Sequence, residues 1–172
     1  MLNRDFTANK PDTVCCSDIT YIWTQTWFVY LTSIMDLYLR KIITWEVLDT
    51  LHVDGIVSCI NKVKKNRVLS NPIIIHSDRG SQYVSKVYRD SLGDNFIRSY
   101  SRKGNPWDNA CIESFHALIK REWLNKYYFK DLMSVRRAIF EYIEVFYNHK
   151  RIHSTLGYQT PKQYEIRYRL SN

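Results

Sequence analysis

The amino-acid sequence predicts an α/β fold whose five-stranded mixed sheet, with three antiparallel strands and then two parallel ones, is flanked by helices. Three patterns lead to this prediction. Three consecutive segments rich in β-branched and aromatic residues are typical of a meander, a short isoleucine run is typical of a buried strand, and helical segments alternate with the later strands. A chain of 172 residues is long enough for one domain with its own core.

The first half of the predicted sheet is the meander. Its strands are expected at residues 16–23, 27–36 and 41–48, and a short polar stretch at residues 24–26 separates the first two. A helix is predicted next, over residues 51–65, because apolar residues recur there at approximately helical spacing. A basic run closes this segment, so its last turn is expected to face solvent.

The second half of the sheet begins with a continuous apolar run. Residues 73–75 are isoleucines that follow Pro72, as in a strand that is buried on both faces. Ser81 is expected to cap the next helix, over residues 81–92, because a serine hydroxyl can accept a hydrogen bond from a free backbone N–H of the first turn. The last strand is predicted over residues 95–99.

The remainder of the chain is predicted to be mostly helical. A loop that contains glycine and proline, residues 101–108, precedes a helix at residues 109–125, and another helix follows at residues 133–147. Pro161 favours the start of a short terminal helix. We treat the chain as one domain with three parts: a lead-in at residues 1–14, a core at residues 15–147 and a basic tail at residues 148–172.

Composition and charge limit the partners to be expected. The four cysteines show no CxxC spacing, which favours a reducing, cytoplasmic setting. No leader or membrane-spanning run is evident, so no membrane role is expected. The formal net charge is +8, and residues 98–172 carry 14 basic against 7 acidic side chains. This imbalance fits either a polyanionic partner or an ordinary basic surface, and charge alone leaves both readings open.

Three carboxylates stand in segments that would hold a metal-binding side chain in place. Asp18 lies inside a predicted strand, where aspartate is disfavoured, Asp78 follows the buried strand, and Glu113 lies one turn into a predicted helix. Carboxylate oxygens suit Mg²⁺, and metal ions supply much of the catalysis in phosphodiester chemistry. Asp36 and Asp108 are rival carboxylates. Each acidic residue also has a structural alternative as a turn residue, a helix cap or a solvated charge.

Basic side chains near these carboxylates and in the tail are candidates for DNA phosphate contacts: Lys120, Arg102, Lys103, His76 and Arg151. Lys120 follows Glu113 by two helical turns on the same face of the predicted helix. Such contacts position a duplex without reading its sequence. The alternatives are a solvated loop for Arg102 and Lys103 and a strand-end cap for His76.

Two further groups are assigned mainly to packing. We expect a set of aromatic residues to pack in the core and between helices, and not to stack on bases: Tyr127, Tyr128, Phe129, Phe140, Tyr142, Phe146 and Tyr147. His149 and His153 stand four residues apart, but no third ligand lies at a spacing that suits zinc.

Several motifs run along nearly the whole chain: SDITY at 17–21, DLYLRKII at 36–43, HSDRGSQY at 76–83, SRKGNPWDNA at 101–110, IESF at 112–115, YNHKRIH at 147–153 and LGY at 156–158. With these motifs the chain resembles the catalytic part of transposases of the IS3 group of insertion sequences, whose core is similar to that of retroviral integrases. The combination of HSDRGSQY with SRKGNPWDNACIES is highly specific for this group.

The resemblance implies a ribonuclease H-like fold with an Asp-Asp-Glu site formed by Asp18, Asp78 and Glu113. Lys120 matches the basic position that the family keeps seven residues after its glutamate. The implied reaction is DNA cleavage at the ends of a mobile element with Mg²⁺ or Mn²⁺, followed by attack of the freed 3′-hydroxyl on another phosphodiester in a two-metal mechanism. The implied partners are the element ends, the target DNA and further copies of the chain.

Two alternatives to a transposase stay open. A stand-alone ribonuclease H-type nuclease would use the same carboxylates but would not join DNA. An inactive or truncated remnant would bind DNA without catalysis. Members of the family usually carry an N-terminal helix-turn-helix region, whereas 17 residues precede Asp18 here. We therefore expect a catalytic core without that DNA-reading region, located in the bacterial cytoplasm with the nucleoid.

Overall fold

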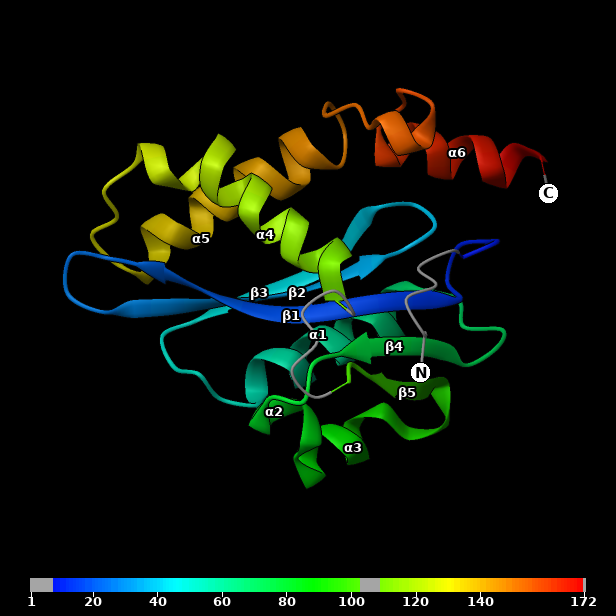
Figure 1. Ribbon diagram of the computed structural model, residues 1–172, viewed down its shortest axis with the longest axis horizontal. Coiled ribbons are helices and arrows are strands. Elements are labelled where there is room, and N and C mark those ends of the chain that lie inside the picture. Colours follow the sequence, from blue (N-terminus) through cyan, green and yellow to red (C-terminus); the bar gives the residue numbers. More distant parts are fainter. Residues whose placement is uncertain (1–7, 103–108, 172) are drawn as a thin grey trace.

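The strands form one sheet with the order β3-β2-β1-β4-β5 (Figure 1). The computed structural model describes residues 8–102 and 109–171. β1 pairs antiparallel with β2 and β2 with β3, whereas β4 pairs parallel with both β1 and β5. The predicted mixed sheet is therefore confirmed, with strands at β1 (Val14–Trp23), β2 (Phe28–Asp36), β3 (Lys41–Leu48), β4 (Ile73–Ser77) and β5 (Phe96–Tyr100).

Helices cover both faces of this sheet (Figure 1). One apolar core lies under α1 (Asp54–Asn66), α2 (Ser81–Val84) and α3 (Lys86–Leu92). The other lies under α4 (Ala110–Glu122), α5 (Leu132–Phe140) and the π-helix η4 (Glu141–Tyr147). Cys15 packs into the first core and Cys16 into the second, because successive side chains of a strand point to opposite faces. In the described ranges, no helix is long and apolar enough to cross a membrane.

The two parallel strands leave part of β1 without a neighbour on one side. β1 pairs with β2 from Cys15 to Trp23 but with β4 only from Val14 to Cys16. Among the described residues, the outer half of β1 therefore forms an edge of the sheet. Side chains on this half are reachable from the edge as well as from the two faces.

The predicted helix over residues 81–92 is in fact two helices. Ser85 adopts an extended backbone between α2 and α3, and its side chain accepts a hydrogen bond from the backbone N–H of Tyr88. Ser81 is the first residue of α2, after Gly80, so the prediction that Ser81 caps the helix is wrong. The cap is at Ser85 because a second helix starts there and leaves new N–H groups free.

The two helices predicted in the C-terminal half also differ in detail. α4 ends at Glu122, and a 3-10 turn, η3 (Leu124–Lys126), follows it. The helix predicted at residues 133–147 is α-helical to Phe140 and π-helical beyond, where the Asn148 N–H donates to the Ile143 carbonyl five residues earlier. The wider turn directs Tyr142, Ile143 and Tyr147 into the core.

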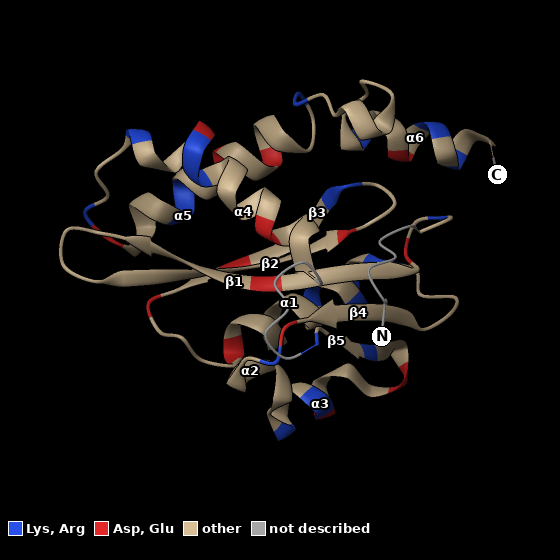
Figure 2. Cartoon of the chain, viewed as in Figure 1, with Lys and Arg blue, Asp and Glu red and all other residues tan. Residues whose placement is uncertain are grey.

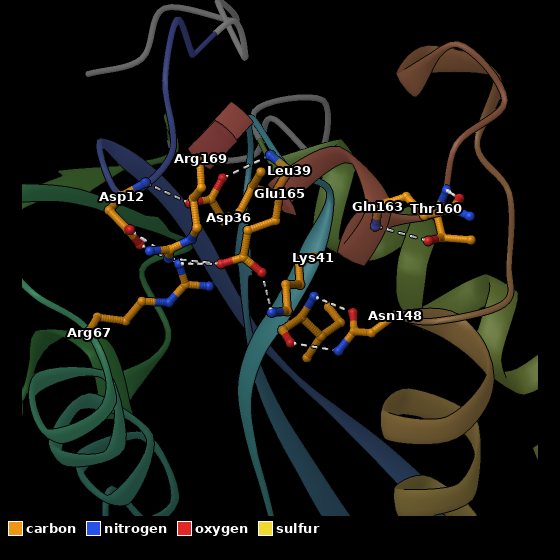
Figure 3. Close-up of polar contacts among 11 residues, drawn as sticks. Asp12, Asp36, Leu39, Lys41, Arg67, Asn148, Thr160, Gln163, Glu165 and Arg169 are labelled. Atoms are coloured by element: carbon orange, nitrogen blue, oxygen red, sulfur yellow. Dashed lines mark hydrogen bonds and ion pairs between the residues drawn. The ribbon is translucent and has the colours of Figure 1, made fainter. Parts of the chain in front are cut away.

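The tail packs directly against the sheet. After a 3-10 turn, η5 (Ser154–Leu156), α6 (Pro161–Ser171) begins at Pro161 as predicted. Glu165 of α6 is 5% exposed and accepts hydrogen bonds from Lys41 on β3, from Arg67 after α1 and from Arg169 (Figure 3). Arg67 also pairs with Asp12, at 2.9 Å between Nη1 and Oδ1. This network joins the lead-in, the sheet, α1 and α6.

Candidate functional site

Asp18 lies on β1 just past the point where β4 stops pairing. It faces Ser33 on β2 and is two residues beyond Cys16, the last residue of β1 paired with β4. It shares the α4 side of the strand with Cys16 and Ile22, which pack in the core beneath α4. The Asp18 side chain keeps 21% exposure, so it lies at the sheet edge within reach of solvent.

Asp78 is the first residue after β4, at the carboxyl end of a parallel strand. Its Oδ1 accepts a hydrogen bond from the Gly80 N–H at 2.9 Å. A Cβ at position 80 would stand 3.1 Å from that oxygen, so glycine leaves room for the turn. The next helix is tied to β1, because the Tyr83 hydroxyl lies 2.9 Å from the Ser17 hydroxyl. The turn is thereby fixed beside Asp18.

Glu113 extends from the first turn of α4, and its side chain is exposed. The start of α4 is held on β1, where the Asn109 side-chain amide donates to the Ser17 carbonyl at 3.3 Å. Partial burial raises the pKa of Glu113, and the negative charges of Asp18 and Asp78 raise it further. The structure therefore brings the three predicted carboxylates, from three different elements, into one electrostatic environment.

His116 is a site residue that the sequence analysis missed. It lies one turn after Glu113 and is buried, with Nδ1 3.2 Å from Asp18 Oδ2 and Nε2 2.7 Å from Ser33 Oγ. A carboxylate only accepts hydrogen bonds, so we assign the proton to Nδ1, and a neutral ring then accepts from the serine hydroxyl. The only sequence signal was a histidine three residues after a candidate glutamate. Its partners are 98 and 83 residues away.

The donor set fits a hard divalent cation. Carboxylates that share one electrostatic environment are favoured by a nearby positive charge, and Mg²⁺ takes one or two carboxylates per ion with water and phosphate in its other positions. Within the described residues, no group of three His, Cys, Asp or Glu side chains is close enough to hold one ion.

The rival carboxylates have different positions. Asp36 is fully buried, and its two oxygens accept hydrogen bonds from the backbone N–H groups of Leu39 and Asp12. It therefore holds the turn after β2. Asp108 lies outside the described residues, and α4 begins after Asn109, whose side chain makes no capping hydrogen bond.

The predicted DNA-contact residues are not equivalent. Lys120 lies beside the site, with its ammonium 4.6 Å from the ring centre of Tyr21, and burial lowers its pKa while Asp18 opposes that shift. His76 is 2% exposed and contacts Ser99 and Ser101, so its position fits a role in joining β4 to β5 and the following loop. Its contact with a DNA phosphate stays a prediction.

The other basic candidates lie further out. Arg151 forms a two-pronged ion pair with Glu122 at the end of α4, which also lowers the pKa of Glu122. Arg102 is exposed at the end of the described segment, and Lys103 lies outside the described residues. Figure 2 shows acidic positions on β1, after β4 and on α4 near the centre of the view, with basic positions further along α4.

The expectation about the aromatic residues is only partly right. Phe129, Tyr142 and Tyr147 are buried, and Phe146 packs against the same core. Three of the rings are exposed instead, at 51% for Tyr127, 96% for Tyr128 and 52% for Phe140.

Two family models match the chain, and known transposases are similar to it. The integrase core domain family matches residues 8–106, and a second form of that domain matches residues 97–161. The chain is 37% identical over 166 residues to the transposase for insertion sequence element IS904 of Lactococcus lactis subsp. lactis (strain IL1403), which covers 96% of this chain and 66% of that protein. It is 34% identical over 166 residues to transposase InsF for insertion sequence IS3A of Escherichia coli (strain K12), covering 96% and 58%.

Solved structures give the same fold. The chain is similar to the HTLV-2 integrase catalytic core domain in complex with magnesium, with a TM-score of 0.65 and 15% identity over 92% of this chain and 99% of that one. This likeness confirms the predicted ribonuclease H-like fold. The chain spans between 58% and 66% of the length of the two curated transposases. With a family match over more than half of its length and IS3-type transposases among its relatives, this chain belongs to the integrase core domain family.

Proposed function

We propose that this chain is the catalytic core of an insertion-sequence transposase, which cleaves DNA at the element ends and transfers the cut strand to a target. The observation that carries the proposal is the common environment of Asp18, Asp78 and Glu113, in which the two aspartates raise the pKa of the glutamate. Membership of the integrase core domain family and the similarity to IS3-type transposases support it. The basic surface of the C-terminal half suits DNA as the substrate.

Asp18, Asp78 and Glu113 are proposed to hold Mg²⁺ or Mn²⁺. Such ions activate the attacking oxygen and neutralise the leaving oxygen of a phosphodiester. His116 holds Asp18 from the side of α4, and the Gly80 N–H holds Asp78. These contacts orient the two carboxylates before DNA arrives. Lys120 is proposed to contact a DNA phosphate next to the site.

The test is a cleavage and strand-transfer assay on a labelled duplex that carries the terminal sequence of the chain's own element. Glu113→Gln is compared with Glu141→Gln, a matched change at a half-exposed glutamate that pairs with Arg137 on α5 and η4. We expect metal-dependent products from the wild type and from Glu141→Gln, and none from Glu113→Gln. Equal activity of Glu113→Gln and the wild type would overturn the assignment.

The same assay separates the two alternatives. Joined products identify a transposase, whereas hydrolysis without joining, together with cleavage of RNA·DNA hybrids, identifies a nuclease. A remnant would bind the labelled duplex without either product. The magnesium-bound HTLV-2 core and the simian T-cell lymphotropic virus intasome among the structural neighbours favour metal-dependent DNA chemistry in a self-associated complex. We therefore propose that the active form contains more than one copy of the chain.

A further inference from the structure

A groove of about 380 Å³ lies at the free edge of β1, next to the carboxylate site. One wall is the end of β1 with Phe28 of β2, and the other is Lys120 of α4 together with residues 124, 125 and 127–129. The two walls are tied together, because the Gln25 N–H donates to the Phe129 carbonyl at 2.9 Å. The groove is thus built from two segments about 100 residues apart in sequence.

Aromatic rings line this groove and stay open to solvent. Tyr21 is 60% exposed, Trp23 57% and Tyr127 51%, although rings of this size are usually covered. Tyr21 and Trp23 both pack edge-on against Phe28, with ring centres 5.3 and 4.7 Å apart. These contacts hold the rings in place while leaving their other sides available. Such an exposed aromatic cluster is typical of a binding surface.

The charge of the side chains that line the groove is positive. Among its lining residues, Lys120 is the single cation and no carboxylate is present. Its ammonium lies 4.6 Å from the ring centre of Tyr21, so the positive charge is fixed at the aromatic wall. A ligand that complements this wall combines a flat ring with a nearby negative charge. A nucleotide of DNA has both.

The groove also lies close enough to the carboxylates for one DNA strand to reach both. Tyr21 follows Asp18 by three strand residues, a rise of about 10 Å, and Lys120 follows Glu113 by seven helical residues, also about 10 Å. A duplex strand covers about 10 Å in three base steps. A strand whose phosphate occupies the carboxylate site therefore reaches the groove within a few nucleotides.

We propose that the groove binds an unpaired nucleobase of the DNA strand that enters the carboxylate site. The base stacks on the rings of Trp23 and Tyr127, and the adjoining phosphate is held by Lys120. This inference rests on the proposed function, because it takes DNA as the substrate. It assigns to the chain a subsite that opens the duplex end, since a base reaches the groove only after it leaves its pair.

The experiment measures binding of fluorescent duplexes by anisotropy, with Ca²⁺ as the metal, so that cleavage is not needed. The duplexes carry the element's terminal sequence with its last few nucleotides unpaired, and an abasic nucleotide is moved through that end one position at a time. We expect a loss of affinity of about 5- to 100-fold at one or two adjacent positions, as for one stacked base. Trp23→Ala should abolish this position dependence.

Trp27→Ala is the matched control. Trp27 is 48% exposed in the neighbouring turn and does not line the groove. It should keep the wild-type position dependence, and circular dichroism should give the same fold for both variants. Equal wild-type affinity for every abasic position overturns the inference, even if the DNA is bound tightly.

If the wild type does not bind the duplex at all, the proposed function itself is contradicted. Failure of the proposed function is therefore distinguishable from failure of the nucleobase proposal, in which DNA is bound without dependence on the abasic position. Sedimentation of the same variants tests another occupant of the groove. If Trp23→Ala changes the oligomeric state and leaves the base dependence intact, the groove is an interface between copies of this chain and the nucleobase proposal is wrong.

Discussion

His116 illustrates, at the scale of single residues, how one buried side chain orients another. Its ring spans the distance between Ser33 on β2 and Asp18 on β1, and both contacts are shorter than 3.3 Å. A carboxylate at an open sheet edge has several rotamers available. The buried imidazole favours one of them, so His116 orients the Asp18 carboxylate.

We expect His116→Ala to raise the Mg²⁺ concentration needed for half-maximal cleavage by about 10- to 100-fold, as for other residues that orient a metal ligand. His116→Asn should recover part of this loss, because its amide nitrogen can occupy the position of Nδ1. The measurement is a metal titration of the cleavage rate. An unchanged titration in His116→Ala, with reduced thermal stability alone, would give His116 a purely structural role.

Asp36 is expected to make stability depend on pH. Burial raises its pKa to about 6 from 3.8, although the Leu39 and Asp12 N–H groups oppose the shift. The folded state therefore holds this proton more tightly than the unfolded state. The resulting stabilisation is fully present below about pH 4 and is lost as the pH rises through about 6.

Urea unfolding of the wild type and Asp36→Asn between pH 4 and 7 tests this expectation. From pH 4 to pH 7 the free energy of unfolding of the wild type should fall by on the order of 2–3 kcal/mol relative to that of the variant. Because both proteins share all other titrating groups, the difference isolates Asp36. A difference that does not change with pH would contradict the raised pKa.

At the scale of elements, breaks in the helices distinguish the structure from the predicted pattern. Apolar spacing predicted one helix over residues 81–92 and another over residues 133–147, and both segments are helical in large part. The break at Ser85 comes with a hydrogen bond that caps α3, and the π-helix after Phe140 comes with the burial of Tyr142, Ile143 and Tyr147. Such contacts do not appear in the spacing of residues along one segment.

Ser85→Ala should destabilise the protein by about 1 kcal/mol, because α3 loses its capping hydrogen bond. Ser81→Ala is the matched control. Ser81 is exposed and its hydroxyl is not the cap, so this change should stay within about 0.5 kcal/mol of the wild type. Chemical denaturation measures the change in the free energy of unfolding for both variants. A larger effect at Ser81 would restore the original prediction.

At the scale of the whole molecule, the polar network around Glu165 holds the tail on the sheet (Figure 3). Burial alone would raise the pKa of Glu165, but hydrogen bonds from Lys41 and Arg169 and the charge of Arg67 lower it to about 2. The carboxylate is thus charged in the folded state over nearly the whole pH range. Two of its partners, Lys41 and Arg67, lie far from Glu165 in sequence, whereas Arg169 is four residues away on the same helix.

Glu165→Gln should destabilise the protein by about 3 kcal/mol at pH 7, since it leaves Lys41 and Arg67 without their shared buried partner. The stabilisation by Glu165 is present above about pH 4.5 and is lost as the pH falls through about 2, so the effect of the substitution should shrink in acid. Glu141→Gln, at a half-exposed pair, should change stability by less than about 0.5 kcal/mol. Thermal unfolding of both variants from pH 7 downwards checks the order and the trend.

The sequence by itself determined the strands, most of the helices and the choice of three candidate carboxylates, because each depends on patterns within one segment or on motifs shared with a family. Only the tertiary structure decided what surrounds them. His116 meets Asp18 across 98 residues, Asp36 is enclosed by Asp12 and Leu39, and the exposed rings of Tyr21, Trp23 and Tyr127 meet at the free edge of β1. The physical reason is that exposure and partners depend on which distant segments pack together, and residue spacing along the chain does not record this.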